Sequence, residues 1–400
     1  MNKMSEVKAA VLHGIRDIRT ETRTVPPPGP DELQIAVRST GICGSDQHYY
    51  NHFRNGDILV REPLALGHES SGVVTAVGSS LSSSWKEGDR VALEVGVPCD
   101  ECDLCKAGRY NICAKMSFRS SAKSFPHFQG TLQGVINHPA KWCHKLPDSV
   151  SLDEAALLEP LSVAMHAVRR ASLTRLGASF SDSSSEIKAK KGVRALVIGA
   201  GAVGLLTAAM LRVEKARSIT LADIEGKRVE FGLANGFADV GVTVPRTRAK
   251  SDSVEDKLSH AQETSKLLQG LGQGQVGESG ELYDVVFECT GVESCIQAAI
   301  YSTAPGGTVM MVGMGTPVGT LPLSSAFLRE VDLRGVFRYA NTYQPGLKIL
   351  EDRKRSGLPD VSLLATHHFK GIESVVDAFA MAAKPIDDQG KLVIKVIIET

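Results

Sequence analysis

Short apolar runs separated by turn residues dominate the first 150 positions of the chain. KAAVLH, ELQIAVRST, SGVVTAVG and DRVALE each have the length and the β-branched content of a strand. In ELQIAVRST, Leu33, Ile35 and Val37 occupy alternate positions, which predicts that they share one face of the strand. The pattern predicts a β-rich domain from about residue 7 to about residue 150.

The hydrophobic pattern changes from strand-like to helical at residue 151, where the segment SLDEAALLEPLSVAMHAVRRA begins. Ser151 stands where an N-cap is expected, and Glu154 follows three residues later, which is the spacing of a capping box. We expect a domain boundary along this helix.

Four buried-type runs follow: RALVIG (194–199), SITLADI (218–224), YDVVFECTG (283–291) and GGTVMMVGM (306–314). Continuous apolar strands separated by helical patterns are typical of a parallel sheet built from βαβ units. We expect a serine-rich surface loop before the first of these runs, at 178–192, and a polar helix with a glycine-rich loop between the second and the third, at 251–282. After about residue 337 the pattern is mixed and ends in the strand-like KLVIKVII.

Length and composition describe a folded protein of about two domains. The chain has 400 residues, of which 42% are hydrophobic and 22% are charged, and it contains 38 glycines. Lys plus Arg balances Asp plus Glu at 45 each, so no global field draws in nucleic acid or an anionic membrane. The N-terminus has no signal-like apolar run, and ALVIGAGAVGLLTAAML (195–211) is broken by glycines; we expect a cytoplasmic protein.

Four of the eight cysteines lie within fifteen residues, in CDECDLCKAGRYNIC. In a reducing compartment, clustered cysteines are more often metal ligands than disulfides. The spacing of Cys99, Cys102, Cys105 and Cys113 suits tetrahedral zinc with four sulfur ligands and no open position, which is a structural site. The alternative, four unrelated core cysteines, is disfavoured by the charged residues between them.

A glycine fingerprint follows the strand RALVI and opens the next helix. In this context Gly199, Gly201 and Gly204 are typical of a dinucleotide site, where they make the turn, admit the pyrophosphate and pack helix on strand. Asp223 ends the next strand, where its carboxylate accepts hydrogen bonds from the adenosine ribose and repels a 2′-phosphate. NAD is favoured over NADP, although Lys227 and Arg228 stand close enough to leave NADP open.

A second metal site is suggested by GICGSDQHYY and LGHESSG. Cys43, then His68 and Glu69, offer three ligand types at unequal spacing in glycine-rich turns. Such a set suits catalytic zinc with one open position, although a lone Cys and a lone His are more often core residues. We interpret Cys143, His144, Cys289 and Cys295 as structural.

These fragments, with the four-cysteine lobe, GAGAVG and LLEPLSVAMHA, resemble the zinc-dependent medium-chain dehydrogenases over nearly the whole chain. NHPAKWCHKLPD, ECTGVES and REVDLRGVFRYANTY resemble their polyol branch: the sorbitol, xylitol and L-arabinitol dehydrogenases. The resemblance implies an α/β fold with a GroES-like β-rich catalytic domain (residues 1–165 and 337–400) and a doubly wound Rossmann domain (166–336). It also implies NAD, one catalytic and one structural zinc per chain, and a homotetramer.

The resemblance also assigns roles to residues. It implies that Cys43, His68 and Glu69 bind the catalytic zinc, with Glu159 either ligating it or holding its water, and that Ser45 and His48 relay the proton. The residues that it places at the substrate are Tyr49, Phe118, Glu159, Arg338 and Tyr339; those at the cofactor, besides the glycines, are Val203, Asp223, Arg228, Val312, Gly313 and Met314. One departure is RSSAKSFPHFQGTLQGV (119–135), which is longer and more polar than expected in polyol dehydrogenases.

We therefore expect oxidation of a secondary hydroxyl of a sugar alcohol to a ketose, with hydride transfer to NAD. One alternative is a zinc dehydrogenase of another small secondary alcohol, such as butanediol or threonine; the polar Tyr49, Arg338 and Tyr339 argue against it. Another is a non-catalytic NAD-binding protein, against which the intact ligand set argues. A quinone reductase of the same superfamily is excluded, since those enzymes lack both zinc sites. The sequence does not choose among the polyols.

Overall fold

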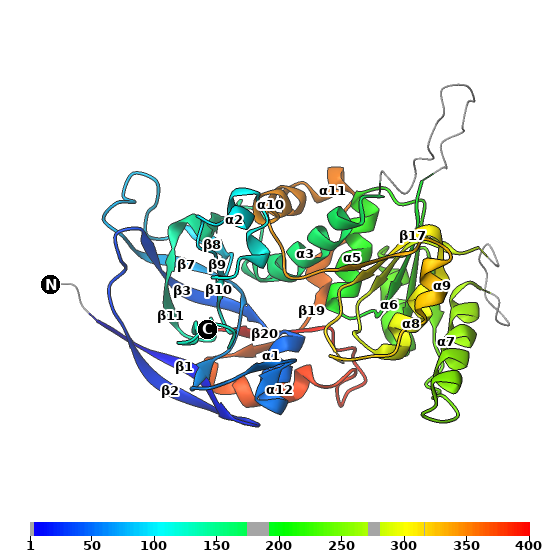
Figure 1. Cartoon of the computed structure of the whole chain (residues 1–400). Helices are drawn as coiled ribbons and strands as arrows, with labels where there is room; N and C mark the ends of the chain where they lie inside the picture. The colour runs from blue at the N-terminus through cyan, green and yellow to red at the C-terminus, as the bar shows by residue number, and fades with distance from the viewer. Residues whose placement is uncertain (1–3, 174–191, 271–280, 316) are drawn as a thin grey trace, which may run out of the picture. The chain divides into compact units, whose positions relative to one another are not determined.

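The computed structural model describes residues 4–173, 192–270, 281–315 and 317–400 (Figure 1). The chain forms two compact units: unit 1 comprises Met1–Ser162, Ala340–Asp352 and Val361–Thr400, and unit 2 comprises Val163–Tyr339 and Arg353–Asp360. The predicted serine-rich loop, apart from Gly192, and the glycine-rich loop at 271–280 lie outside the described residues. No helix within the described ranges is long and apolar enough to cross a membrane.

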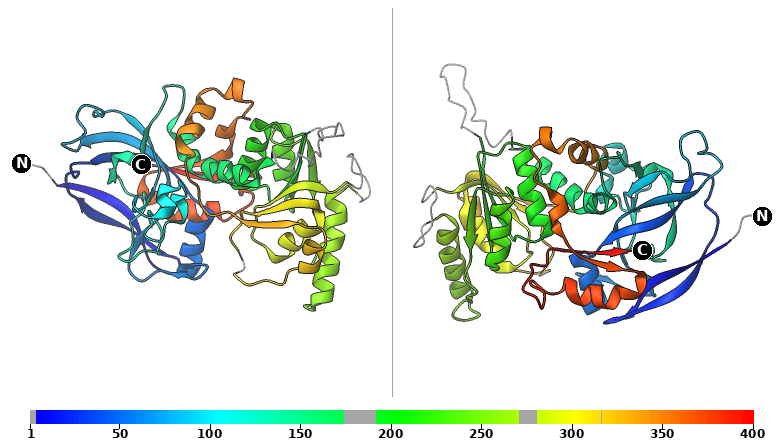
Figure 2. Two further views of the ribbon diagram at one scale, coloured as in Figure 1. Left: turned by 45° about the horizontal axis from the view of Figure 1, so that its top comes forward. Right: turned by 180° about the vertical axis from the view of Figure 1, so that it is seen from behind.

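Unit 1 is rich in short strands, as the sequence predicts, and both ends of the chain contribute to it (Figure 2). Its strands are β1 (Ser5–Gly14), β2 (Asp17–Val25), β3 (Glu32–Gly41), β4 (Arg54–Asn55), β5 (Ile58–Leu59), β6 (Leu64–Ala65), β7 (Glu69–Val77), β8 (Arg90–Leu93), β9 (Gly96–Val97), β10 (Ser117–Phe118), β11 (Val135–Pro139), β12 (Cys143–Lys145), β19 (Ala365–Lys370) and β20 (Lys395–Glu399). Its helices are α1 (Gly44–His52), α2 (Asp103–Lys106), α10 (Tyr343–Glu351) and α12 (Val375–Ala382), with the single turns η1 (Tyr110–Ile112), η2 (Ala140–Trp142), η3 (Val361–Leu364) and η4 (Ile372–Ser374).

The main sheet of unit 1 has seven strands in the order β12-β8-β7-β3-β20-β19, with β11 also paired to β3. Leu33, Ile35 and Val37 of β3 are all buried, and Gln34 and Ala36, at the positions between them, are buried as well. Strand β3 lies centrally in the sheet and is covered on both faces. The C-terminal β20 pairs antiparallel with β3, Ile397 opposite Gly41, which joins the two ends of the chain.

Helix α3 (Leu152–Ala171) runs from unit 1 into unit 2, and the division between the units falls after Ser162. The predicted capping box is confirmed at its start. The Glu154 backbone N–H donates to Ser151 Oγ at 3.2 Å, and the Ser151 N–H donates to Glu154 Oε2 at 2.9 Å. These bonds satisfy two of the N–H groups that a helix start leaves without intrahelical partners.

Unit 2 contains the predicted parallel sheet, in the order β15-β14-β13-β16-β17-β18 (Figure 1). Its strands are β13 (Arg194–Ile198), β14 (Ser218–Asp223), β15 (Val240–Thr243), β16 (Tyr283–Glu288), β17 (Thr303–Met311) and β18 (Asp332–Gly335). Its helices are α5 (Ala202–Val213), α6 (Gly226–Ala234), α7 (Val254–Leu268), α8 (Glu293–Ser302), α9 (Leu323–Phe327) and α11 (Arg353–Ser356). All five residues of β13 are buried, as expected for a strand covered on both faces.

Candidate metal centres and cofactor site

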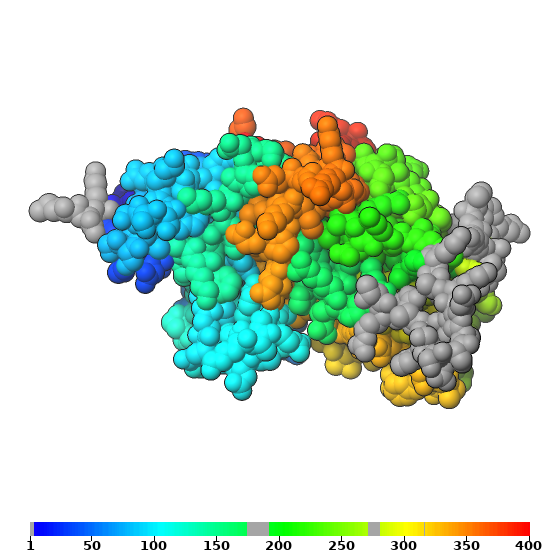
Figure 3. Space-filling model, turned by 90° about the horizontal axis from the view of Figure 1, so that it is seen from above, coloured from blue at the N-terminus to red at the C-terminus, as the bar shows by residue number. Residues whose placement is uncertain are grey.

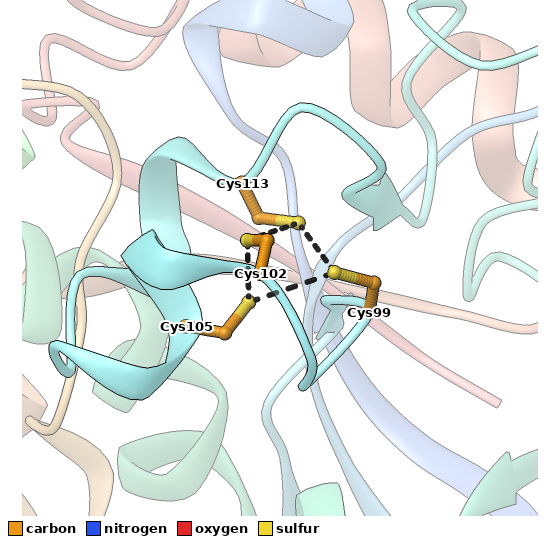
Figure 4. Close-up of side chains that lie close together, drawn as sticks. All are labelled: Cys99, Cys102, Cys105 and Cys113. Carbon is orange, nitrogen blue, oxygen red and sulfur yellow. Dashed lines mark hydrogen bonds between the residues drawn. The ribbon is translucent and has the colours of Figure 1, made fainter.

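The four clustered cysteines of unit 1 point their sulfur atoms toward one another (Figure 4). The Sγ–Sγ distances are 3.4 Å for Cys102–Cys105, 3.5 Å for Cys99–Cys113, and 3.9 Å for both Cys99–Cys105 and Cys102–Cys113. None of these cysteines is in a disulfide. Four sulfurs about 2.3 Å from a zinc ion at the centre of a tetrahedron are about 3.8 Å apart, so the donor set fits a closed four-thiolate zinc site.

Helix α2 and the turn η1 position three of these four sulfur atoms. Cys102 is the N-cap of α2 and Cys105 lies within that helix, while Cys113 follows η1. Backbone N–H groups of Glu101 and Cys102 donate to the Cys99 sulfur and lower its pKa to about 6, which favours the thiolate that zinc requires. The lobe lies at the surface of unit 1, where its segment is cyan in Figure 3.

A buried polar network anchors the lobe to the rest of unit 1. Glu94 Oε1 accepts from Tyr110 Oη at 2.7 Å, and Glu94 Oε2 contacts His144 Nε2 at 2.7 Å. The Asn341 backbone N–H donates to Tyr110 Oη at 2.7 Å, and Asn341 Nδ2 donates to the Gly108 carbonyl at 2.7 Å. His144 is therefore part of a structural network, and Cys143 is buried beside Pro139 O.

The second cluster joins Cys43, His68 and Glu69, whose ligand atoms all lie within 4.8 Å of one another. Cys43 is the N-cap of α1, His68 precedes β7, and Glu69 begins β7. His68 and Glu69 are buried, and Cys43 is partly exposed. One thiol, one imidazole and one carboxylate are the donor types of a three-ligand zinc site that keeps a position for substrate.

Glu69 has a cationic partner that the sequence patterns did not indicate. The buried Lys395 ammonium lies 2.8 Å from Oε1 and 2.7 Å from Oε2 of Glu69. Gly41, on the neighbouring strand, leaves room for this carboxylate, since a Cβ there would lie 2.3 Å from Oε2. Glu159 is buried on α3 but lies outside the group of three mutually close ligands found among the described residues.

Asp46 is a further residue that the motifs did not single out. Its fully buried carboxylate accepts hydrogen bonds from the backbone N–H groups of Cys43 (3.1 Å) and Gly67 (3.2 Å), and Oδ1 lies 3.4 Å from His68 Nδ1. Burial lowers the pKa of His68, but the Asp46 carboxylate and the Cys43 sulfur outweigh it and raise that pKa well above its usual value. The signal available in the sequence was position, because Asp46 lies three residues after the N-cap of α1.

Of the remaining predicted residues of unit 1, Ser45 and Phe118 lie beside His68. Ser45 Oγ lies 3.4 Å from His68 Nε2, and the ring centroid of Phe118 lies 5.7 Å from that of His68. Tyr49 is buried on α1, and its hydroxyl accepts a hydrogen bond from the Ala122 N–H at 3.2 Å. His48, on the same helix, is half-buried; burial and the nearby His52 lower its pKa.

In unit 2 the glycine fingerprint forms the turn between β13 and α5. Gly199 has φ +99°, a conformation that favours glycine, and a Cβ on Gly204 would lie 1.7 Å from the Gly199 carbonyl. Gly201 is the N-cap of α5, and its missing Cβ faces open space. An open approach to the start of a helix is what a pyrophosphate requires.

Asp223 ends β14 and is tied to this turn. Its Oδ2 accepts from the Ala200 N–H at 2.6 Å, and Oδ1 accepts from the Glu225 N–H at 2.8 Å. The carboxylate is thereby fixed beside the glycine turn, where a ribose would meet it and a 2′-phosphate would be repelled. Val203 lies in the first turn of α5 and Arg228 in the first turn of α6.

The predicted nicotinamide segment follows β17. Val312 and Gly313 both donate their N–H groups to the Glu288 carbonyl at 2.9 Å. A Cβ on Gly313 would lie 2.1 Å from the Gly291 nitrogen, so this approach requires glycine, and Met314 beyond it is exposed. Arg338 and Tyr339 belong to the same unit; Arg338 has φ +53°, and its guanidinium lies 4.8 Å from the Phe337 ring centroid.

Family models match both parts of this arrangement. Residues 29–148 match the alcohol dehydrogenase GroES-like domain, and residues 202–352 match the zinc-binding dehydrogenase domain. The chain is 37% identical to the sorbitol dehydrogenase of Gallus gallus over 371 residues, which is 93% of this chain and 92% of the relative. The chain belongs to the zinc-dependent medium-chain dehydrogenases, in their polyol branch.

Solved structures of dehydrogenases share the fold. An Escherichia coli oxidoreductase/dehydrogenase of unknown specificity is 29% identical, with a TM-score of 0.78 over 99% of both chains. The 2R,3R-butanediol dehydrogenase of Bacillus subtilis is 26% identical, with a TM-score of 0.73 over 98% of this chain and 99% of that one. This medium-chain dehydrogenase is an oxidoreductase with NAD and zinc as its cofactors.

Proposed function

We propose that the protein oxidises a secondary hydroxyl of a sugar alcohol, of the sorbitol, xylitol or L-arabinitol type, to the ketose with reduction of NAD. The observation that carries this proposal is the convergence of Cys43, His68 and Glu69 within 4.8 Å. It is supported by the 37% identity to sorbitol dehydrogenases over most of the chain. A non-catalytic NAD-binding protein would have no need of an open three-ligand metal cluster.

We assign the catalytic metal to Cys43, His68 and Glu69, with Glu159 as the residue that holds its water, and the structural metal to Cys99, Cys102, Cys105 and Cys113. When bound, zinc supplies a Lewis acid for the substrate oxygen and NAD supplies the hydride acceptor. The thiolate and the Glu69 carboxylate offset the charge of the metal, and Lys395 offsets part of the charge of Glu69.

The hydroxyl proton leaves through the residues of α1. We propose that Ser45, beside His68, passes it toward His48, three residues along the helix and therefore near the same face. The lowered pKa of His48 keeps this imidazole neutral at pH 7 and able to accept a proton. The C–H electron pair leaves with its hydrogen as hydride, so one alcohol and one oxidised cofactor give one ketone, one reduced cofactor and one proton.

A sugar alcohol carries a hydroxyl on every carbon, so its site needs several polar partners. We propose that Tyr49, Glu159, Arg338 and Tyr339 hold these hydroxyls and that Phe118 closes the pocket beside His68. The Tyr49 hydroxyl already accepts from the Ala122 N–H, so its own hydrogen is available for donation to a substrate oxygen. A small diol has fewer hydroxyls than a sugar alcohol and would form hydrogen bonds with fewer of these groups.

For the cofactor, we propose that Gly199, Gly201 and Gly204 receive the pyrophosphate, and that Val203, Asp223 and Arg228 contact the adenosine half. The backbone at Val312, Gly313 and Met314 is proposed to face the nicotinamide. The resemblance to polyol dehydrogenases further supports a homotetramer, a cytoplasmic location, and catalytic and nucleotide domains bounded near residues 165 and 336.

The proposal is tested by following NADH formation at 340 nm with sorbitol, xylitol, L-arabinitol, galactitol, 2,3-butanediol and threonine, each with NAD and with NADP. We expect turnover of one or more polyols with NAD. Turnover of 2,3-butanediol or threonine alone would replace the polyol assignment, and turnover of none by protein holding both zinc ions would defeat the function proposed.

A further inference from the structure

The side-chain hydroxyl of Ser120 contacts the buried Asp46 carboxylate. Ser120 Oγ donates to Asp46 Oδ1 at 2.7 Å, and both residues are buried, with 3% and 0% of their surfaces exposed. An ionised carboxylate only accepts hydrogen bonds, so the serine is the donor. A hydrogen bond to a charged acceptor away from water is among the stronger kinds.

Asp46 in turn links the two segments that carry the candidate ligands of the catalytic zinc. Its Oδ2 accepts from the Cys43 N–H at 3.1 Å, while Oδ1 accepts from the Gly67 N–H at 3.2 Å and lies 3.4 Å from His68 Nδ1. Cys43 and Gly67 are separated in sequence by β4, β5 and β6. The carboxylate thus fixes the spacing of Cys43 and His68, and Ser120 fixes the carboxylate.

The backbone holds Ser120 in place for this contact. Its φ is +62°, and its N–H donates to the Phe128 carbonyl at 2.9 Å. The residues on either side reach the same site: Phe118 packs on the His68 ring, and the Ala122 N–H donates to the Tyr49 hydroxyl. This segment belongs to the 119–135 region, whose polar character set it apart in the sequence.

We propose that Ser120 is a positioning residue for the catalytic zinc, acting through Asp46 on His68 and Cys43. The inference rests on the proposed function only in requiring a metal at Cys43, His68 and Glu69. Removal of the hydroxyl leaves Asp46 held by the Cys43 and Gly67 N–H groups alone, so its carboxylate is less firmly positioned against the imidazole and the spacing of the ligand pair is less fixed. Partners of this kind typically change metal affinity or activity by about 10- to 100-fold when they are removed.

The test compares zinc loss from the full-length protein in Ser120→Ala, Ser120→Gly and Ser124→Ala. Glycine suits the positive φ of Ser120, so Ser120→Gly removes the hydroxyl without adding backbone strain. Ser124 is the matched control from the same segment, because its Oγ is buried and has no hydrogen-bond partner. Zinc-loaded protein is mixed with excess dipicolinate, and the metal released is followed with a chromogenic chelator.

We expect both Ser120 variants to release one zinc ion per chain about tenfold faster than the parent protein, while the four-cysteine zinc and NADH binding stay unchanged. Ser124→Ala should match the parent. The inference would be overturned if a folded Ser120→Gly protein released zinc at the parent rate, or if Ser124→Ala accelerated zinc release equally. It would also be overturned if the parent protein held only the four-cysteine zinc. Because the readout needs no substrate, a protein with both zinc ions that oxidises no sugar alcohol defeats the proposed function alone.

Discussion

The buried ammonium of Lys395 lies within 2.8 Å of both carboxylate oxygens of Glu69, although 326 residues separate the two in sequence. Pairing of β20 with β3 brings them together. Without metal, this ion pair is the main compensation for the buried Glu69 charge. With metal, the carboxylate has a second cationic partner.

Replacing Lys395 with methionine should therefore destabilise the metal-free protein more than the zinc-loaded protein. Breaking one side of a buried ion pair costs on the order of 3 kcal/mol, and zinc bound to Glu69 would offset part of this cost. The free energy of unfolding, measured by denaturant with and without zinc, checks the difference. Lys391→Met is the control, because the Lys391 ammonium is exposed and donates to the Thr366 carbonyl. If Lys395→Met lost the same free energy of unfolding with and without zinc, the role of Glu69 as a ligand would be contradicted.

Cys105→Ser should remove the structural zinc and leave the catalytic one. A hydroxyl replaces one of four thiolates, and the closed site depends on all four sulfurs. Metal analysis should fall from two zinc ions per chain to one, with a lower midpoint of thermal unfolding. Cys143→Ala is the control, because the Cys143 sulfur lies outside the cluster and contacts the Pro139 carbonyl; retention of both ions in Cys105→Ser would exclude the four-thiolate site.

Asp223→Asn should relax the preference for NAD. The neutral amide no longer repels a 2′-phosphate, and relief of at least ~1.4 kcal/mol of like-charge repulsion corresponds to about tenfold. The ratio of kcat/KM for NADP to that for NAD should rise by that factor or more, while activity with NAD falls, since the amide keeps one of the two backbone hydrogen bonds. Glu225→Gln, whose carboxylate pairs with Arg246, should leave the ratio unchanged.

The pH dependence of kcat should report His48. Burial and His52 lower the pKa of His48, so the imidazole is neutral and accepts protons down to a pH below ~6.5, and activity falls as it becomes protonated. His48→Gln should lower kcat at pH 7 by about 100-fold and flatten this acidic limb. His52→Gln removes a like charge, which raises the pKa of His48 and moves the acidic limb of the kcat profile to higher pH. If the acidic limb is unchanged in both variants, the proton does not leave through His48.

Features that depend on local spacing were accessible from the sequence. The four cysteines lie within fifteen residues, and the glycine turn follows directly on a buried strand, so chain geometry alone nearly specifies both sites. The alternating apolar residues of β3 did not show that the positions between them are buried too, because the cover on the second face of a strand comes from the rest of the fold. The neighbours of β3 come from distant parts of the chain.

The partners of the catalytic cluster were not accessible in this way. Lys395 lies beside Glu69 because β20 pairs antiparallel with β3 and parallel with β19 in one specific register. No local sequence pattern indicates that pairing. Asp46 and Ser120 are polar residues of common types in glycine- and serine-rich stretches, and only the fold shows that they are buried against each other. Contacts made across long loops carry no short-range pattern.

The measurement that tests the central claim most directly is NADH formation from a polyol in protein stripped of the zinc at Cys43, His68 and Glu69 and then reloaded. We predict turnover by the loaded protein, its loss when this zinc ion is removed while the four-cysteine zinc and NADH binding remain, and its recovery on reloading. Turnover that persists without this zinc ion, or its absence in protein that holds both ions, would contradict the assignment of these three residues as the catalytic centre of a polyol dehydrogenase.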